Sequence, residues 1–181
     1  MSTGRRALGP PLTTLSSPGR GLEPLSLRGN AALLGHPLIG LFCSVRCPGS
    51  AILRALEWVK TLPPFGADGP RIISGFHSPI EQECLRGLIR RQVVTIVCPA
   101  REIARYHWPV DWDEPLQNGR MLLVSPFITE RRPTAATGER RNRLVALLAD
   151  QIVVIHAEAG GRIEALIDYC KRQGKKVTCL S

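Results

Sequence analysis

Short apolar runs alternate with amphipathic stretches along most of the chain. The runs have the length and continuous hydrophobicity of β-strands that are buried on both faces. They lie at residues 38–43, 71–74, 93–97, 121–124, 152–155 and 176–180. The amphipathic stretches have helical spacing and lie at residues 50–61, 78–91, 134–149 and 161–173. Strands joined by helical crossovers predict an α/β fold: a doubly wound, mostly parallel, Rossmann-like sheet with helices on both faces.

Local signals mark where several of these elements begin. Ser50 is expected to cap the first helix. Ser78 is a stronger cap, because a proline and an acidic residue follow it in the first helical turn. The strand at 152–155 is expected near the centre of the sheet. Residues 101–119, which hold two tryptophans and two prolines, are expected to form a loop or short helix on the surface.

The size and composition of the chain indicate one domain. At 181 residues and 44% hydrophobic content, it can build one substantial core but not two large ones. Residues 1–24 are interrupted by prolines and are expected to form a flexible basic N-terminal arm, with residues 25–181 as a single domain. No apolar run approaches the ~18 residues that a membrane span needs, so we expect no membrane partner.

The net charge and the spacing of the cysteines indicate which classes of ligand and cofactor to expect. A formal net charge of +9 favours a polyanion through counterion release, and arginine adds bidentate geometry toward phosphate. The six cysteines contain no C-x-x-C pair, so neither a zinc site nor any other metal or cofactor is expected. Reduced thiols suit the cytoplasm.

Three loops that follow apolar runs contain small residues and lead into helices. They lie at residues 44–49, 74–78 and 159–162. Unpaired N–H groups at a helix start bind anions, and the carboxyl ends of parallel strands meet at one edge of a sheet. We therefore expect a basic phosphate-binding pocket at the C-terminal edge of the sheet. His77 is expected to be a hydrogen-bonding loop residue rather than a catalyst, because no G-x-S-x-G elbow surrounds it.

An arginine cluster lies in the first half of the helix at 134–149, where the helix dipole disfavours cations. Glu130 and Glu139 can offset part of that cost, and an external phosphate would offset the rest. The candidate phosphate- and nucleic-acid-binding residues are Ser44, Arg46, Ser74, Gly75, His77, Ser78, Arg101, Arg141, Asn142, Arg143, Gly160 and Gly161.

An ordered series of short motifs runs through the chain from Leu25. The series comprises Leu27-Arg28-Gly29-Asn30, Phe42-Cys43-Ser44-Val45-Arg46, Ile73-Ser74-Gly75, Gly75-Phe76-His77-Ser78-Pro79-Ile80-Glu81, and Arg141-Asn142-Arg143-Leu144 before the strand at 152–155. In this order the motifs resemble those of the DNA-processing protein A family (DprA, also called Smf), in a short, single-domain branch with a Rossmann-like domain.

This resemblance implies a non-enzymatic protein that binds single-stranded DNA. It further implies that the DNA is handed to the RecA recombinase during natural transformation, and that the protein forms a homodimer. The positions matched to the family's motifs are Ser44, Arg46, Ser74, Gly75, Asn142 and Arg143.

Two alternatives remain open from the sequence. The chain also resembles the lysine decarboxylase-like phosphoribohydrolases at Glu139-Arg140-Arg141 and at Gly160-Gly161. That likeness implies a sensor or hydrolase of a small nucleotide. Against hydrolysis, Ala159 replaces the proline of that group's glycine motif, its Gly-Thr pair is missing, and Glu164 comes too early. The second alternative is a partner-binding scaffold with a vestigial pocket.

Overall fold

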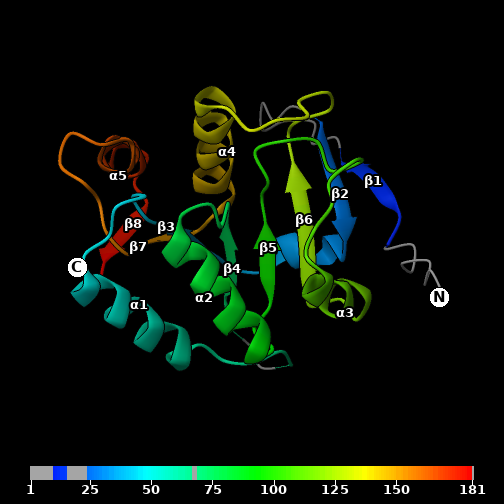
Figure 1. The fold of residues 1–181 in the computed structure, drawn as a ribbon, viewed down its shortest axis with the longest axis horizontal. Helices are drawn as coiled ribbons and strands as arrows, with labels where there is room; N and C mark the ends of the chain where they lie inside the picture. The colour runs from blue at the N-terminus through cyan, green and yellow to red at the C-terminus, as the bar shows by residue number, and fades with distance from the viewer. Residues whose placement is uncertain (1–9, 16–23, 67–68, 181) are drawn as a thin grey trace, which may run out of the picture.

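One mixed sheet organises the computed structural model, which describes residues 10–15, 24–66 and 69–180 (Figure 1). The strands of that sheet follow the order β1-β2-β6-β5-β4-β3-β7-β8. Their bounds are Leu12–Leu15 (β1), Leu25–Gly29 (β2), Leu38–Phe42 (β3), Arg71–Ser74 (β4), Thr95–Val97 (β5), Met121–Ser125 (β6), Gln151–Val154 (β7) and Lys176–Cys179 (β8). Strands β3 to β8 pair in parallel, whereas β1 and β2 are antiparallel to their neighbours.

Helices cover both faces of the sheet, as the sequence pattern predicts. Their bounds are Gly49–Thr61 (α1), Pro79–Arg90 (α2), Asp113–Gln117 (α3), Ala135–Leu148 (α4) and Arg162–Arg172 (α5), with 3₁₀ turns at Ala31–Gly35 and Val110–Trp112. Side chains of α1, α2 and α3 share one apolar cluster, and those of α4 and α5 share the other. Successive strand residues alternate between the two clusters: Ile72 packs toward α1 and α2, and Ile73 toward α4 and α5. The fold is thus Rossmann-like, as predicted.

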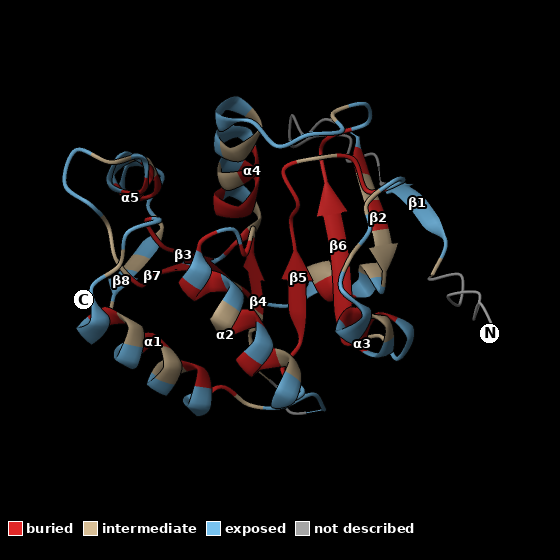
Figure 2. Cartoon of the chain, in the orientation of Figure 1, coloured by how far each residue is buried: buried red, intermediate tan, exposed pale blue. Residues whose placement is uncertain are grey.

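Burial follows the order of the strands. Figure 2 shows β4, β5 and β6 buried in the middle of the sheet, while β1 and β8 at its two edges are largely exposed. Strand β7, which was expected near the centre, lies next to the edge strand β8 instead. Its continuous apolar run reflects cover by α5 on one face and by residues near α1 on the other, rather than a central position.

Three local expectations differ from the structure. Leu12–Leu15, within the segment expected to be flexible, form β1 and pair with β2, whereas residues 1–9 and 16–23 lie outside the described part. Ser50 does not cap α1, because Pro48 is the N-cap and makes no side-chain cap bond. The segment at 101–119 contains the short helix α3, one of the two expected forms, but it does not lie wholly on the surface, since Trp112 and Leu116 are buried in the core.

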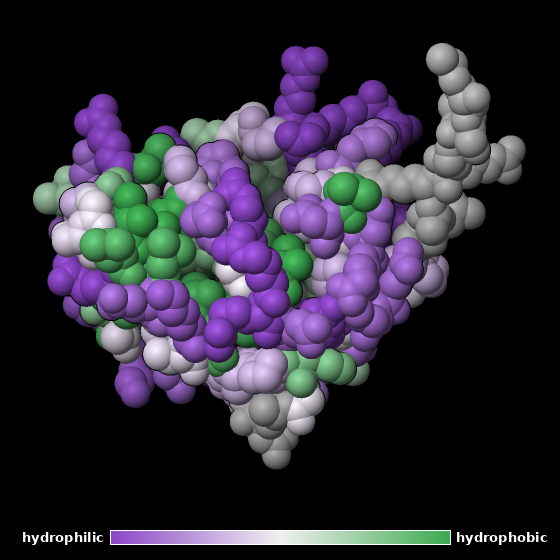
Figure 3. Space-filling view, turned by 60° about the horizontal axis from the view of Figure 1, so that its bottom comes forward, coloured by the Kyte–Doolittle hydropathy of each residue, from purple (hydrophilic) through white to green (hydrophobic). Residues whose placement is uncertain are grey.

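The surface is mainly hydrophilic. Figure 3 shows an apolar area at the left, on the side where Figure 1 places α1, and the exposed apolar residues Val45 and Leu53 belong to α1 and the loop before it. Within the described ranges, no helix has the length and hydropathy needed to span a bilayer.

Gly29 provides a test of the junction between β2 and β6. It has φ +113°, and a Cβ on it would lie 2.5 Å from the Met121 carbonyl oxygen. We expect Gly29→Ala to lower the free energy of unfolding by about 2 kcal/mol or more, because the backbone is strained and the strands are pushed apart. The matched control is Gly35→Ala, whose Cβ would meet nothing within 4 Å. Equal urea midpoints for the two variants would contradict this account.

Candidate functional site

Three strand-to-helix loops line one cavity of about 560 Å³ at the carboxyl ends of β3, β4 and β7. The β3–α1 loop contributes Ser44, the β4–α2 loop contributes His77 and Ser78, and the β7–α5 loop contributes Gly161. The fourth wall is the first half of α4. The structure therefore brings together the three loops that the sequence placed at one edge. We call this space the loop cavity.

The carboxylate of Glu81 lies beneath the loop cavity and holds two of the loops in place. Its Oε1 accepts a hydrogen bond from the Cys43 N–H (3.0 Å), and its Oε2 accepts from the N–H groups of His77 (2.9 Å) and Ser78 (2.8 Å). Ser78 Oγ in turn accepts from the Glu81 N–H, which completes a capping box at the start of α2. The Glu81 side chain is buried and its two oxygens share three main-chain donors.

The protein itself bonds the main-chain N–H groups that we expected, from sequence, to bind a ligand. Besides the donors at His77 and Ser78, the Gly160 N–H donates to Glu164 Oε2 (2.6 Å) and the Gly161 N–H donates to the Glu158 carbonyl (2.9 Å). The acidic side chains of Glu81 and Glu164, each in the first turn of its helix, satisfy N–H groups at the start of that helix, and the Gly161 N–H is bonded within a turn. The expectation that these amides form an open anion cradle is corrected by this arrangement.

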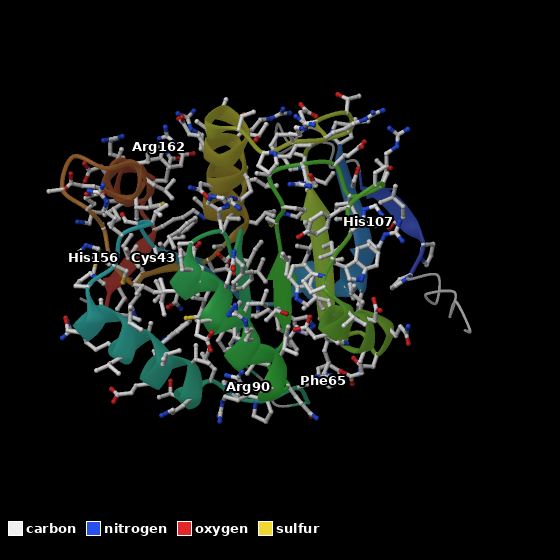
Figure 4. All side chains as sticks on the ribbon, in the orientation of Figure 1. Cys43, Phe65, Arg90, His107, His156 and Arg162 are labelled. Carbon is white, nitrogen blue, oxygen red and sulfur yellow. The ribbon has the colours of Figure 1, made fainter. Side chains whose placement is uncertain are left out.

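Ser44 links the first loop to the third. Its N–H donates to the His156 carbonyl (2.9 Å), and its Oγ accepts from the Glu158 N–H (2.9 Å). Figure 4 places Cys43 and His156 close together, where β3 and β7 end side by side. Ser44 thus positions the β7–α5 loop over the cavity, a structural role that adds to its place in the lining.

Arg141 is buried in the wall of the loop cavity. Only 5% of its surface is exposed; Nη1 donates to the Cys98 carbonyl (3.2 Å) and Nε donates to Asn142 Oδ1 (2.7 Å). Burial lowers the pKa of the Arg141 guanidinium, and the Glu81 carboxylate acts in the opposite direction. The guanidinium lies directly over Gly75, where an added Cβ would come within 1.6 Å of Nη1. Gly75 therefore makes room for Arg141 rather than for a ligand.

Several other candidate residues lie outside the loop cavity. Ser74 is fully buried and its Oγ accepts from the Phe76 N–H (3.1 Å). The exposed Arg46 side chain lies 3.8 Å from Glu158. Arg101 packs over the ring of Tyr106, with 5.7 Å between the guanidinium carbon and the ring centre, on the side of the sheet near β6.

Arg143 is also outside the loop cavity, because it points along the exposed side of α4. Its Nη2 lies 2.8 Å from Glu139 Oε1, one helical turn earlier. It lines a neighbouring groove instead. Of the predicted set, the loop cavity gathers Ser44, His77, Ser78, Arg141, Asn142 and Gly161.

The charge of the lining differs from the basic pocket that was expected. Glu81, Glu139 and Glu158 contribute three carboxylates, against the two guanidinium groups of Arg141 and Arg162. Sequence reasoning included Arg162 only as the last residue of the loop at 159–162 and missed Glu158, which lies between the end of β7 and that loop. Within the described ranges, no three histidine, cysteine or acidic residues are grouped to hold a metal ion.

Buried thiols lie behind the site. All six cysteines are free. Burial raises the pKa of the Cys98 thiol to about 12, partly opposed by Arg141. Burial, with the nearby Glu81 and Glu83 carboxylates, raises that of Cys84 to about 12 as well. Burial, with the neighbouring Cys47 and Glu81, raises the pKa of Cys43 still further above its usual value. These thiols are protonated and unreactive at neutral pH.

We expect Gly75→Ala to displace the Arg141 guanidinium and to lower the free energy of unfolding by about 1–3 kcal/mol, because the Cys98 carbonyl loses a buried donor. The control is Gly49→Ala, at the exposed start of α1, whose Cβ would meet nothing within 4 Å. Chemical denaturation measures the stability, and a crystal structure of the variant locates the guanidinium. An unmoved Arg141 in that structure would contradict the packing described above.

The buried thiols also predict how stability depends on pH. A thiol whose folded-state pKa is raised to about 12 stabilises the fold fully below the unfolded value and loses that contribution as pH rises toward 12. Starting from an unfolded pKa of about 8.5, each such thiol should lower stability by about 1.4 kcal/mol per pH unit in this window. Denaturant titrations from neutral to alkaline pH, under reducing conditions, measure the slope. Cys98→Ala should make this slope shallower, and an unchanged slope in that variant would contradict the account.

Comparison with known proteins gives a family and a fold. A family model described as DNA recombination-mediator protein A matches residues 22–181, whereas no curated protein gives a significant match. DNA processing protein A from Streptococcus pneumoniae superposes with a TM-score of 0.71 at 18% identity, covering 86% of this chain and 54% of that one. DNA processing protein A from Helicobacter pylori gives 0.69 at 18% identity, covering 93% and 80%.

A third structure, the molybdenum cofactor carrier protein of Chlamydomonas reinhardtii, gives a TM-score of 0.51 at 14% identity, covering 80% of this chain and 76% of that one. At these identities the likeness of the structures establishes the fold alone. The chain spans about half the length of the pneumococcal protein, at 54%. The match of the family model extends over nearly the whole sequence. The chain therefore belongs to the DNA recombination-mediator protein A (DprA) family.

Proposed function

We propose that this chain binds single-stranded DNA and accommodates part of the strand in the loop cavity. The observation that carries the proposal is the convergence of three strand-to-helix loops and α4 on one cavity in a chain of net charge +9. Membership of the DprA family supports it, and the Helicobacter pylori relative is described by its single-stranded DNA binding mode. A cavity of about 560 Å³ is in the range of small-ligand sites.

The lining suits the polar and aromatic parts of a nucleotide. The exposed imidazole of His77 offers a flat face on which a base can stack. The carbonyl oxygen of the Asn142 side chain is bonded to Arg141, so its amide nitrogen is the group that this residue can offer to a ligand. Glu81 is saturated by main-chain donors and balanced by Arg141, so it leaves the cavity floor rigid.

Hydrolysis of a small nucleotide has less support. Glu164 is bonded to the main chain at Gly160 and does not line the cavity. Family membership suggests two further roles, delivery of the bound strand to a RecA-type recombinase and assembly as a homodimer. We include them as parts of the proposal that need their own tests, because the chain spans only 54% of the pneumococcal relative.

Binding of a labelled oligothymidylate, followed by fluorescence anisotropy at several salt concentrations, tests the proposal. We expect log affinity to fall with log salt by roughly 0.7 per phosphate contact. His77→Ala should weaken binding about tenfold through lost stacking. The control is His107→Ala, an exposed histidine at the opposite end of the sheet (Figure 4).

The result that would overturn the proposal is affinity for a mononucleotide equal to that for the oligonucleotide, or no binding of either. Equal affinities of the two histidine variants would place the DNA elsewhere on the surface. Neither substitution touches a side-chain hydrogen bond of the described fold, so both variants should melt at the same temperature as the unaltered protein.

A further inference from the structure

A second groove, about 300 Å³ in volume, lies between α4 and α5, next to the loop cavity. The two spaces share Glu139, Asn142 and Arg162 in their linings. Arg143, Tyr169 and Arg172 line only the second one, which we call the α4–α5 groove. The two spaces are therefore neighbours, and a strand that leaves the loop cavity past the shared side chains reaches this groove next.

The α4–α5 groove has the positive charge that the loop cavity lacks. Three guanidinium groups line it against one carboxylate, that of Glu139. Glu139 is paired with Arg143 at 2.8 Å. Arg162 and Arg172 form no ion pair with any residue of the described ranges, and both are exposed. Two uncompensated guanidinium groups thus remain available to an anionic partner.

The sequence spacing along α5 places the side chains that line the groove on one face of this helix. Arg162, Tyr169 and Arg172 are related by seven and three residues, so all three lie on one face of the helix. Arg162 is the first residue of α5 and Arg172 the last, which puts them about 15 Å apart along the axis. Figure 4 places Arg162 on the side of α5 that faces α4. Two arginines at this separation can contact different phosphates of one strand, with the half-buried Tyr169 ring between them.

We infer that the α4–α5 groove binds the sugar-phosphate backbone of the single-stranded DNA whose neighbouring nucleotide occupies the loop cavity. Arg162 and Arg172 bind phosphates through paired N–H donors, and Tyr169 stacks against a base. This inference rests on the proposed function and assigns its phosphate contacts to α5. Arg46 and Arg101 are outside both spaces, and Arg141 is enclosed by the protein.

Arg172→Ala and Lys171→Ala form a matched pair for the test. The two residues are neighbours in the last turn of α5, both exposed and both cationic, but they differ by about 100° around the helix. Only Arg172 lines the groove. We expect Arg172→Ala to weaken oligothymidylate binding roughly tenfold at low salt and to reduce the salt slope by about 0.7. Lys171→Ala should change neither quantity appreciably.

Tyr169 gives an independent measurement. Tyr169→Phe keeps the ring and should retain affinity, whereas Tyr169→Leu removes the stacking surface and should lose about tenfold. Thermal unfolding of both variants shows whether the fold is intact, since Tyr169 also packs at the edge of the α4–α5 core cluster. Loss of affinity in an intact Tyr169→Leu protein, with retention in Tyr169→Phe, supports the inference.

The outcomes separate this inference from the proposed function. If the unaltered protein binds no single-stranded DNA, the proposed function and the groove inference are both wrong. If it binds DNA and His77→Ala weakens binding, but Arg172→Ala behaves like Lys171→Ala, the groove inference alone is overturned. If Arg172→Ala binds oligothymidylate normally but loses affinity for an acidic peptide, the groove is a protein-docking surface and the inference is likewise wrong.

Discussion

The candidate site depends on one buried carboxylate. Glu81 is on α2, yet it accepts hydrogen bonds from the end of β3 as well as from the loop at the start of its own helix. A buried charge is costly unless donors surround it, and three main-chain N–H groups with a nearby guanidinium meet that requirement. β3 and β4 are paired directly in the sheet, and this side chain ties together the two loops that follow them.

Arg141 and Gly75 follow from the same constraint. A buried carboxylate stabilises a buried cation, and the guanidinium of Arg141 partly offsets the charge of Glu81. The Cys98 carbonyl, beyond the end of β5, supplies a further partner for that guanidinium. Only a residue without Cβ leaves space for this arrangement at position 75. The small residue in the loop is therefore explained by internal packing, and its presence in sequence does not by itself identify a ligand contact.

Much of the fold could be predicted because its signals are local or periodic. Apolar runs of strand length gave β3 to β8 close to their observed bounds, and Ser78 with Glu81 marked the start of α2. Strands β1 and β2 were missed, since an antiparallel hairpin at a sheet edge carries weak hydrophobic patterning; exposed threonines make up the middle of β1. The position of β7 next to the edge strand β8 could not be derived either, because strand order depends on contacts distant in sequence.

Some features of the site could likewise be predicted from sequence, and others could not. Topology predicts which loops meet. Whether a main-chain N–H in those loops is free for a ligand depends on which acidic side chain lies close enough to bond it in three dimensions. The arginines of α4 illustrate this. Sequence reasoning expected Glu130 and Glu139 to offset only part of their charge. In the structure Arg140 lies 3.7 Å from Glu130, Arg143 is paired with Glu139, and Arg141 is enclosed.

Once the α4 arginines are accounted for internally, they no longer require an external phosphate to offset the helix dipole. Among the described residues that line the two spaces, Arg162 and Arg172 on α5 form no ion pair; Arg162 lines both spaces, and Arg172 lines the α4–α5 groove alone. A polyanion responds to uncompensated charge at the surface, since buried and paired charges release few counterions on binding. In the proposed binding mode, the electrostatic part of recognition therefore comes from the flank of α5 rather than from the loops, and the loops supply shape and polar contacts.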